Sequence, residues 1–176
     1  MTALVLRPSR PLALDAGLAL ALSGVLALSA HAQVPFYPVP LTLQVLAILL
    51  IAAFAGPRAA IGAVAAYLVE GAAGLPVFAG TPARGIGLAY MAGHTGGYLV
   101  GYAVAMAGIA LLIDRVRPVL RPALLLAGVA VIYALGFAWL ATFIGAERAF
   151  AAGVLPFLLG DAVKVAIVSA AVLLRR

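Results

Sequence analysis

The sequence predicts an all-α membrane protein in which six transmembrane helices form one bundle, within a single domain that covers residues 1–176. Hydrophobic residues make up 66% of the chain and charged residues only 9%, whereas a soluble domain carries about 25% charged residues. The apolar residues fall into separate blocks, and most basic residues lie between them. Lipid suits such a chain, because exposed apolar side chains are stable there.

Six apolar blocks account for the predicted helices. They span residues 11–30, 39–55, 59–73, 90–113, 119–143 and 155–174. About 20 helical residues cross the roughly 30 Å hydrocarbon core, and the first, fourth, fifth and sixth blocks meet that length. The second and third are shorter, so we expect them to be tilted or to extend into their flanks.

The first block has a second interpretation as a secretory signal peptide. Arg7 and Arg10 precede it, and Ala30-His31-Ala32 resembles a small-x-small cleavage site. The apolar stretch is long for a signal peptide, however, and five more blocks follow. We therefore expect it to be retained as a transmembrane helix.

The arginines predict the orientation of the bundle. With a cytoplasmic N-terminus, the outer segments hold only Arg84 and Arg148. The cytoplasmic segments then hold Arg7, Arg10, Arg58, Arg115, Arg117, Arg121, Arg175 and Arg176. Cytoplasmic loops carry an excess of Lys and Arg, so both termini are predicted to be cytoplasmic.

Several functional classes are excluded or disfavoured. The net charge of +6 does not indicate nucleic-acid binding, because the basic residues form no stripe. The chain has no cysteine, which excludes a thiolate metal site and a cysteine nucleophile. The sequence contains no GxxxxGK(S/T), HExxH or GxSxG motif. We expect no enzymatic activity, no metal and no cofactor.

The segment between the third and fourth blocks, residues 74–87, is unusually apolar for a loop. It contains Pro76, Phe78 and Pro82. Non-helical backbone at membrane depth is tolerated where it is buried in protein or lines a cavity. The segment is therefore either a re-entrant, site-lining loop or an ordinary external connection.

Asp161 and Lys164 are the clearest polar residues within an apolar block. Their spacing places them on one face of a helix. They either neutralise each other and anchor the helix, or form a polar site for a small molecule with hydrogen-bond donors and an anionic group.

The fourth block carries two stripes at a spacing of four residues. The polar stripe contains Tyr90, His94, Tyr98 and Tyr102, and the stripe of small residues contains Gly93, Gly97, Gly101 and Ala105. The small residues predict a close approach of another helix. The tyrosines either stack on a ligand ring or anchor the helix at the interface, and His94 is either a ligand contact or a packing residue.

Four stretches resemble the BioY family, whose members are substrate-binding membrane subunits of energy-coupling factor biotin transporters. Residues 38–44 are similar to its PVPxTLQ motif, 74–80 to GLPVFAG, 95–102 to TGGYLxGF, and 156–164 to PFxxGDxxK. They occur in the family's order and extend over most of the chain from Pro38 onward. His94 departs from the family's pattern, which usually has Pro before TGGY.

The resemblance implies a six-helix S component in a bacterial cytoplasmic membrane that binds biotin near the outer face. It also implies a transmembrane coupling (T) subunit and cytoplasmic ATPase (A) subunits as partners. Biotin has a ureido ring with two N–H donors and a carbonyl, and a tail that ends in a carboxylate. Asp161 is expected to accept the N–H groups, Lys164 to bind the carbonyl or the carboxylate, and Arg84 to compete for the carboxylate.

Further site residues follow from the same resemblance. Phe78, Tyr90 and Tyr98 are expected to enclose the apolar part of biotin. Thr42 and Gln44 either cap the second helix or bind the ligand. Gly80, in the GLPVFAG stretch, and His94 complete the expected set. The alternatives are an S component for another vitamin, such as thiamine or riboflavin, and a structural membrane subunit without a ligand.

Overall fold

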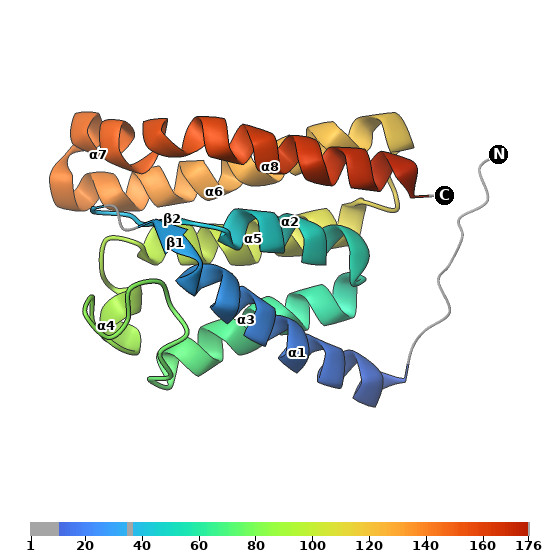
Figure 1. Cartoon of the computed structure of the whole chain (residues 1–176), viewed down its shortest axis with the longest axis horizontal. Coiled ribbons are helices and arrows are strands. Elements are labelled where there is room, and N and C mark those ends of the chain that lie inside the picture. Colours follow the sequence, from blue (N-terminus) through green and yellow to red (C-terminus); the bar gives the residue numbers. More distant parts are fainter. Residues whose placement is uncertain (1–10, 35–36, 176) are drawn as a thin grey trace.

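A computed structural model describes residues 11–34 and 37–175 and shows a bundle of long helices (Figure 1). The long helices are α1 (Leu12–His31), α2 (Gln44–Phe54), α3 (Pro57–Ala72), α5 (Gly96–Leu112), α6 (Arg121–Ile144) and α8 (Leu155–Leu174). The shorter elements are β1 (Gln33–Val34), β2 (Leu41–Thr42), α4 (Leu88–Met91), η1 (Pro118–Leu120) and α7 (Ala146–Gly153). The all-α prediction is confirmed, since the two short strands form only one antiparallel pair.

The helices differ in their capacity to cross a membrane. Within the described part of the chain, three are long and apolar enough by length and composition: Leu12–His31, Pro118–Ile144 and Leu155–Leu174. Helix α2 has 11 residues and α3 has 16, which correspond to about 17 and 24 Å at 1.5 Å per residue. The count of six spans therefore stays a prediction, as does the membrane orientation. Arg7, Arg10 and Arg176 lie outside the described residues.

The prediction of one helix over residues 90–113 was wrong. Tyr90 belongs to α4, and α5 begins only at Gly96. Residues 92–95 form a turn between the two helices, where the Gly96 N–H donates to the Gly93 carbonyl at 3.1 Å. A Cβ at Gly96 would collide with the Met91 carbonyl oxygen. The turn is short (Ala-Gly-His-Thr) and apolar residues flank it on both sides, so a count of apolar residues over the whole block did not reveal the break.

Helix α5 lies at the centre of the bundle and packs against α6, α3 and α2, while α1 packs on α3 and α8 packs on α6 and α2. Gly97 and Gly101 of the stripe of small residues provide the close approach of α5 to α6, as predicted, whereas Gly93 precedes α5 and faces the carbonyls of Tyr90 and Ala89. A Cβ at Gly97 would collide with Trp139, and one at Gly101 would lie 2.9 Å from the Ile132 Cα.

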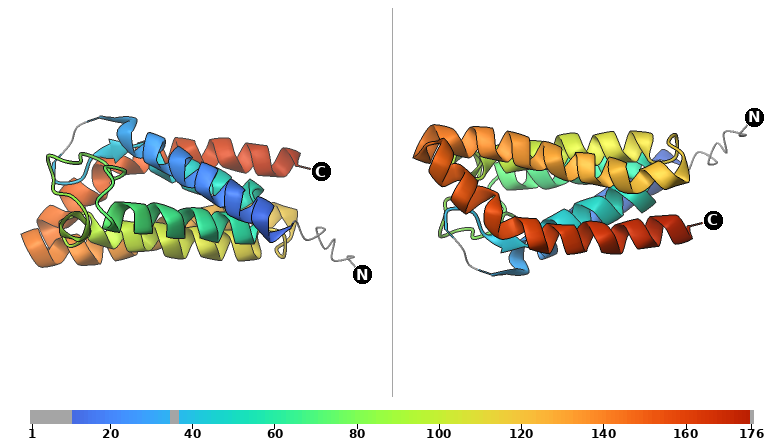
Figure 2. Two further views of the ribbon diagram at one scale, coloured as in Figure 1. Left: turned by 90° about the horizontal axis from the view of Figure 1, so that it is seen from below. Right: turned by 90° about the horizontal axis from the view of Figure 1, so that it is seen from above.

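The two ends of the bundle have different character. The start of α1 and the end of α8 lie at one end, and the strands, α4 and α7 lie at the other (Figures 1 and 2). Two sharp reversals use glycine with positive φ: Gly56 (φ 90°) between α2 and α3, and Gly145 (φ 82°) between α6 and α7. The end that carries the strands holds the predicted site residues.

Candidate functional site

Three cavities form a series near the strand end of the bundle. The inner cavity, lined by Asp161, Lys164 and Tyr133, has a volume of about 20 Å³. The middle cavity, lined by Gln44 and Tyr67, is also about 20 Å³. The outer cavity measures about 280 Å³. A volume of about 20 Å³ holds roughly one water molecule, whereas ligand pockets usually begin near 300 Å³.

Shared wall residues connect the series. The inner and middle cavities have a common wall of Val39, Pro40, Thr42, Tyr98 and Tyr102. Tyr90 and Thr95 line both the middle and the outer cavity. The segment 37–42, just before α2, therefore borders all three cavities and connects the Asp161 end to the Arg84 end.

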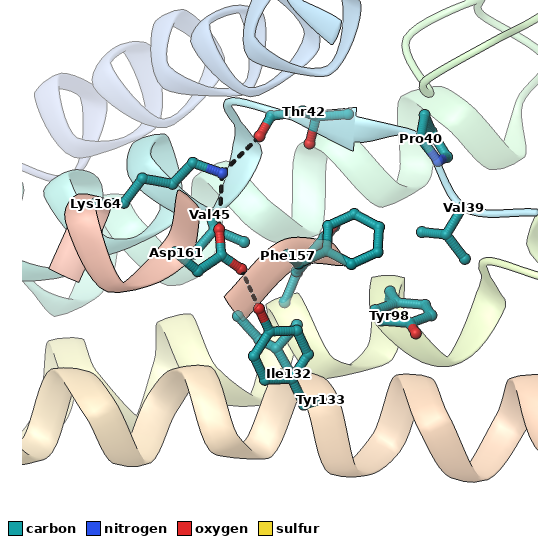
Figure 3. Close-up of a pocket in the computed structure, with 11 residues that line it drawn as sticks. Val39, Pro40, Thr42, Val45, Tyr98, Ile132, Tyr133, Phe157, Asp161 and Lys164 are labelled. Carbon is teal, nitrogen blue, oxygen red and sulfur yellow. Dashed lines mark hydrogen bonds and ion pairs between the residues drawn. The ribbon is translucent and has the colours of Figure 1, made fainter. Parts of the chain in front are cut away.

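Asp161 is the centre of a buried polar cluster in the inner cavity (Figure 3). Its side chain is only 4% exposed, and Lys164 Nζ donates to Oδ1 at 2.7 Å while the Tyr133 hydroxyl donates to Oδ2 at 2.6 Å. Lys164 also donates to the Thr42 carbonyl at 2.8 Å. The ion pair and both hydrogen bonds compensate the burial of the carboxylate, whose oxygens can still accept further bonds.

Tyr133 was not identified from the sequence. It is a single tyrosine within the apolar block 119–143, and the position of its hydroxyl depends on how α6 packs against α8. Because Asp161 is 28 residues away, the chain carries no local signal for this contact.

Thr42 and Gln44 bind protein groups and also line cavities. The Thr42 hydroxyl accepts the N–H of Gln44, the first residue of α2, at 3.2 Å. Gln44 Nε2 donates to the Tyr67 hydroxyl at 2.8 Å. Thr42 thus satisfies one N–H at the start of α2, as a capping side chain does, and both side chains border the middle cavity.

Tyr90, Tyr98 and His94 occupy three different positions. The Tyr90 hydroxyl donates to the Ala79 carbonyl at 2.7 Å, and the Tyr98 hydroxyl donates to the Gly153 carbonyl at 2.8 Å. His94 lines the outer cavity, with its ring 5.0 Å from that of Phe143. Tyr90 and His94 precede α5, so the expected four-residue stripe is not continuous.

Arg84 lies in the wall of the outer cavity. Its Nη1 donates to the Pro38 carbonyl at 2.8 Å, which connects the segment after α3 to the segment before α2. Gly80 supports this placement: its φ is +80°, and a Cβ there would lie 2.8 Å from the Arg84 Cδ.

Phe78 lies behind the cavity walls rather than in them. It is fully buried, and its ring stacks on Tyr90 at 4.9 Å and meets Tyr67 edge-on at 5.2 Å. The segment 74–87 therefore contributes Ala79, Ala83 and Arg84 to the cavities, while Phe78 holds two tyrosines in place.

Comparisons with known proteins agree on one family. The family model described as BioY family matches residues 6–176. The chain is 40% identical over 139 residues to the probable biotin transporter BioY of Pyrococcus horikoshii, covering 78% of this chain and 80% of that protein. It is 35% identical over 155 residues to the biotin transporter BioY of Thermotoga maritima, covering 87% and 89%.

A solved structure shares the fold. The crystal structure at 2.1 Å of the S-component for biotin from an ECF-type ABC transporter superimposes with a TM-score of 0.78. The two chains are 21% identical, and the match covers 92% of this chain and 89% of the other.

Proposed function

This chain belongs to the BioY family, and from that premise we propose that it is the biotin-binding S component of an energy-coupling factor transporter. Its relatives are named as biotin transporters. This agrees with the expectation that the chain has no enzymatic activity. The observation that carries the proposal is the series of cavities, with a buried carboxylate at one end and an arginine at the other.

The two ends of the series match the two polar ends of biotin. Asp161 accepts an N–H of the ureido ring, because a carboxylate is an acceptor with capacity beyond its bonds to Tyr133 and Lys164. Lys164 lies 2.7 Å from Asp161, which favours its contact with the ureido carbonyl over the carboxylate. Arg84, in the outer cavity, then binds the carboxylate.

Apolar and aromatic groups occupy the region between these ends. Val39, Tyr98 and Leu99 line the middle cavity and enclose the ring and the aliphatic chain of biotin, as the walls of small-molecule sites usually do. Thr42, Gln44, Tyr90 and His94 border the same path. Phe78 and Gly80 act indirectly, by supporting Tyr90 and Arg84.

Binding requires the wall to move, because cavities of about 20 Å³ cannot hold a bicyclic ring. The segment 37–42 borders all three of these cavities and is held by the bond from Arg84 to the Pro38 carbonyl. The guanidinium has five N–H donors, so Arg84 can bind the ligand carboxylate while Nη1 keeps its bond to the Pro38 carbonyl.

The proposal extends to the membrane and to partners. The protein lies in a bacterial cytoplasmic membrane with both termini in the cytoplasm, supported by the arginine distribution. A transmembrane T subunit and cytoplasmic A subunits supply the energy for release of biotin.

Binding of radiolabelled biotin, thiamine and riboflavin to the purified protein, each in a separate arm, tests the proposal. Binding of biotin alone is expected. Binding of thiamine or riboflavin in place of biotin would identify an S component for another vitamin. Absence of binding to all three would favour a structural membrane subunit.

A further inference from the structure

Tyr102 differs from the other tyrosines around the cavities in the state of its hydroxyl. Four tyrosine hydroxyls already have protein partners: Tyr67 with Gln44, Tyr90 with Ala79, Tyr98 with Gly153 and Tyr133 with Asp161. Tyr102, on α5, lines both the inner and the middle cavity. Within residues 11–34 and 37–175, its hydroxyl has no hydrogen-bond partner.

Tyr102 is half-buried and lines two cavities that each hold about one water molecule, so its hydroxyl is open to whatever occupies those cavities rather than to a protein group. Tyr102 therefore places an unused donor and acceptor at the wall that the inner and middle cavities share. Such an unused polar group in a small-molecule site commonly fixes the orientation of the ligand.

We infer that the Tyr102 hydroxyl donates a hydrogen bond to the ureido carbonyl oxygen of the ligand, an inference that rests on the proposed function. Asp161 lines the same inner cavity and can accept only the N–H groups of the ureido ring. The carbonyl oxygen has two lone pairs and needs donors. Lys164 can supply one, and Tyr102 supplies the other.

Other donors near the ring fit this role less well. Tyr133 already donates to Asp161, and Tyr98 already donates to Gly153. Tyr67 borders only the middle cavity. Tyr102 is thus a specificity-determining residue that favours a carbonyl oxygen over a weaker acceptor at the same position of the ligand.

The test compares biotin with 2-thiobiotin, in which sulfur replaces the carbonyl oxygen, on the unsubstituted protein and on Tyr102→Phe. Loss of one hydrogen bond should weaken biotin binding by about tenfold, with a much smaller change for 2-thiobiotin. Tyr98→Phe is the comparison variant: it should change both affinities by the same factor, because its hydroxyl binds the backbone of Gly153.

An equal loss for both ligands, or no loss for biotin, would overturn the inference. The ligand-free Tyr102→Phe protein should be about as thermostable as the unsubstituted protein, because the substitution removes no hydrogen bond to a described protein group, so a variant that fails to fold would also contradict it. If the unsubstituted protein does not bind biotin, the proposed function itself fails.

Discussion

Asp161→Asn is the most direct perturbation of the site. Asparagine preserves the size of the side chain but removes its charge and replaces one acceptor oxygen with a donor NH₂ group. In the structure, both carboxylate oxygens are engaged, by Lys164 at 2.7 Å and by Tyr133 at 2.6 Å. The substitution therefore weakens both the cluster and its capacity to accept an N–H of the ligand.

The expected magnitude follows from the burial of this group. A hydrogen bond to a charged group contributes about 1.5–3 kcal/mol, so affinity for biotin should fall by roughly ten- to hundredfold. Removing one partner of a buried ion pair costs about 3–5 kcal/mol. We expect a loss of stability near the lower figure, because the Lys164 side chain is 16% exposed and keeps its bond to Thr42.

Titration calorimetry in lipid nanodiscs measures the affinity, and thermal unfolding with and without biotin measures the stability. At a fixed biotin concentration, a tenfold loss of affinity lowers the stabilisation by the ligand by about 1.4 kcal/mol. Asp15→Asn is the matched control, because Asp15 is 8% exposed on α1 and borders none of the three cavities. It should leave the affinity for biotin unchanged.

Unchanged affinity in folded Asp161→Asn protein would refute the reasoning. Intact biotin binding after joint replacement of Asp161 by Leu and Lys164 by Met would also refute it, because the two residues would then only anchor α8.

Three further substitutions test the rest of the site. Arg84→Gln should weaken the binding of biotin by about tenfold or more and leave the binding of biotin methyl ester unchanged in calorimetry; an equal loss for both would place the carboxylate elsewhere. Tyr133→Phe removes one of the two protein donors to Asp161 and should weaken biotin binding by about three- to tenfold, while an unchanged affinity would show that Tyr133 does not position Asp161. Gly80→Ala should lower the free energy of unfolding by about 1–2 kcal/mol, because φ is +80° there, and should displace the Arg84 side chain; full stability in thermal unfolding would contradict the role assigned to this glycine.

Much of the fold could be predicted because the bilayer imposes a strong compositional signal. Long apolar blocks mark α1, α6 and α8 within one or two residues of their ends. The break before α5 was missed because the less apolar residues 92–95 (Ala-Gly-His-Thr) are too few to divide a long block when apolar residues are counted over its whole length.

The candidate site was predictable only in part. Asp161 and Lys164 were recognisable because charged residues are costly within an apolar block, and their contact is local, at a separation of three residues. Phe78 was expected to enclose a ligand, yet it supports Tyr67 and Tyr90 from behind. A phenylalanine ring suits either role, enclosing a ligand or supporting other aromatic rings, and only its packing in the structure distinguishes the two.

The sequence by itself determined that the chain lies in lipid, that its fold is all-α and that it belongs to the BioY family, because these depend on composition, spacing and ordered motifs. The tertiary structure decided which polar groups meet across long separations in the chain, such as Tyr133 with Asp161 and Arg84 with Pro38. It also revealed that the hydroxyl of Tyr102 lacks a partner within the described residues. The physical reason is that a hydrogen bond depends on position and direction within a few tenths of an ångström, and the packing of α5, α6 and α8 sets that position.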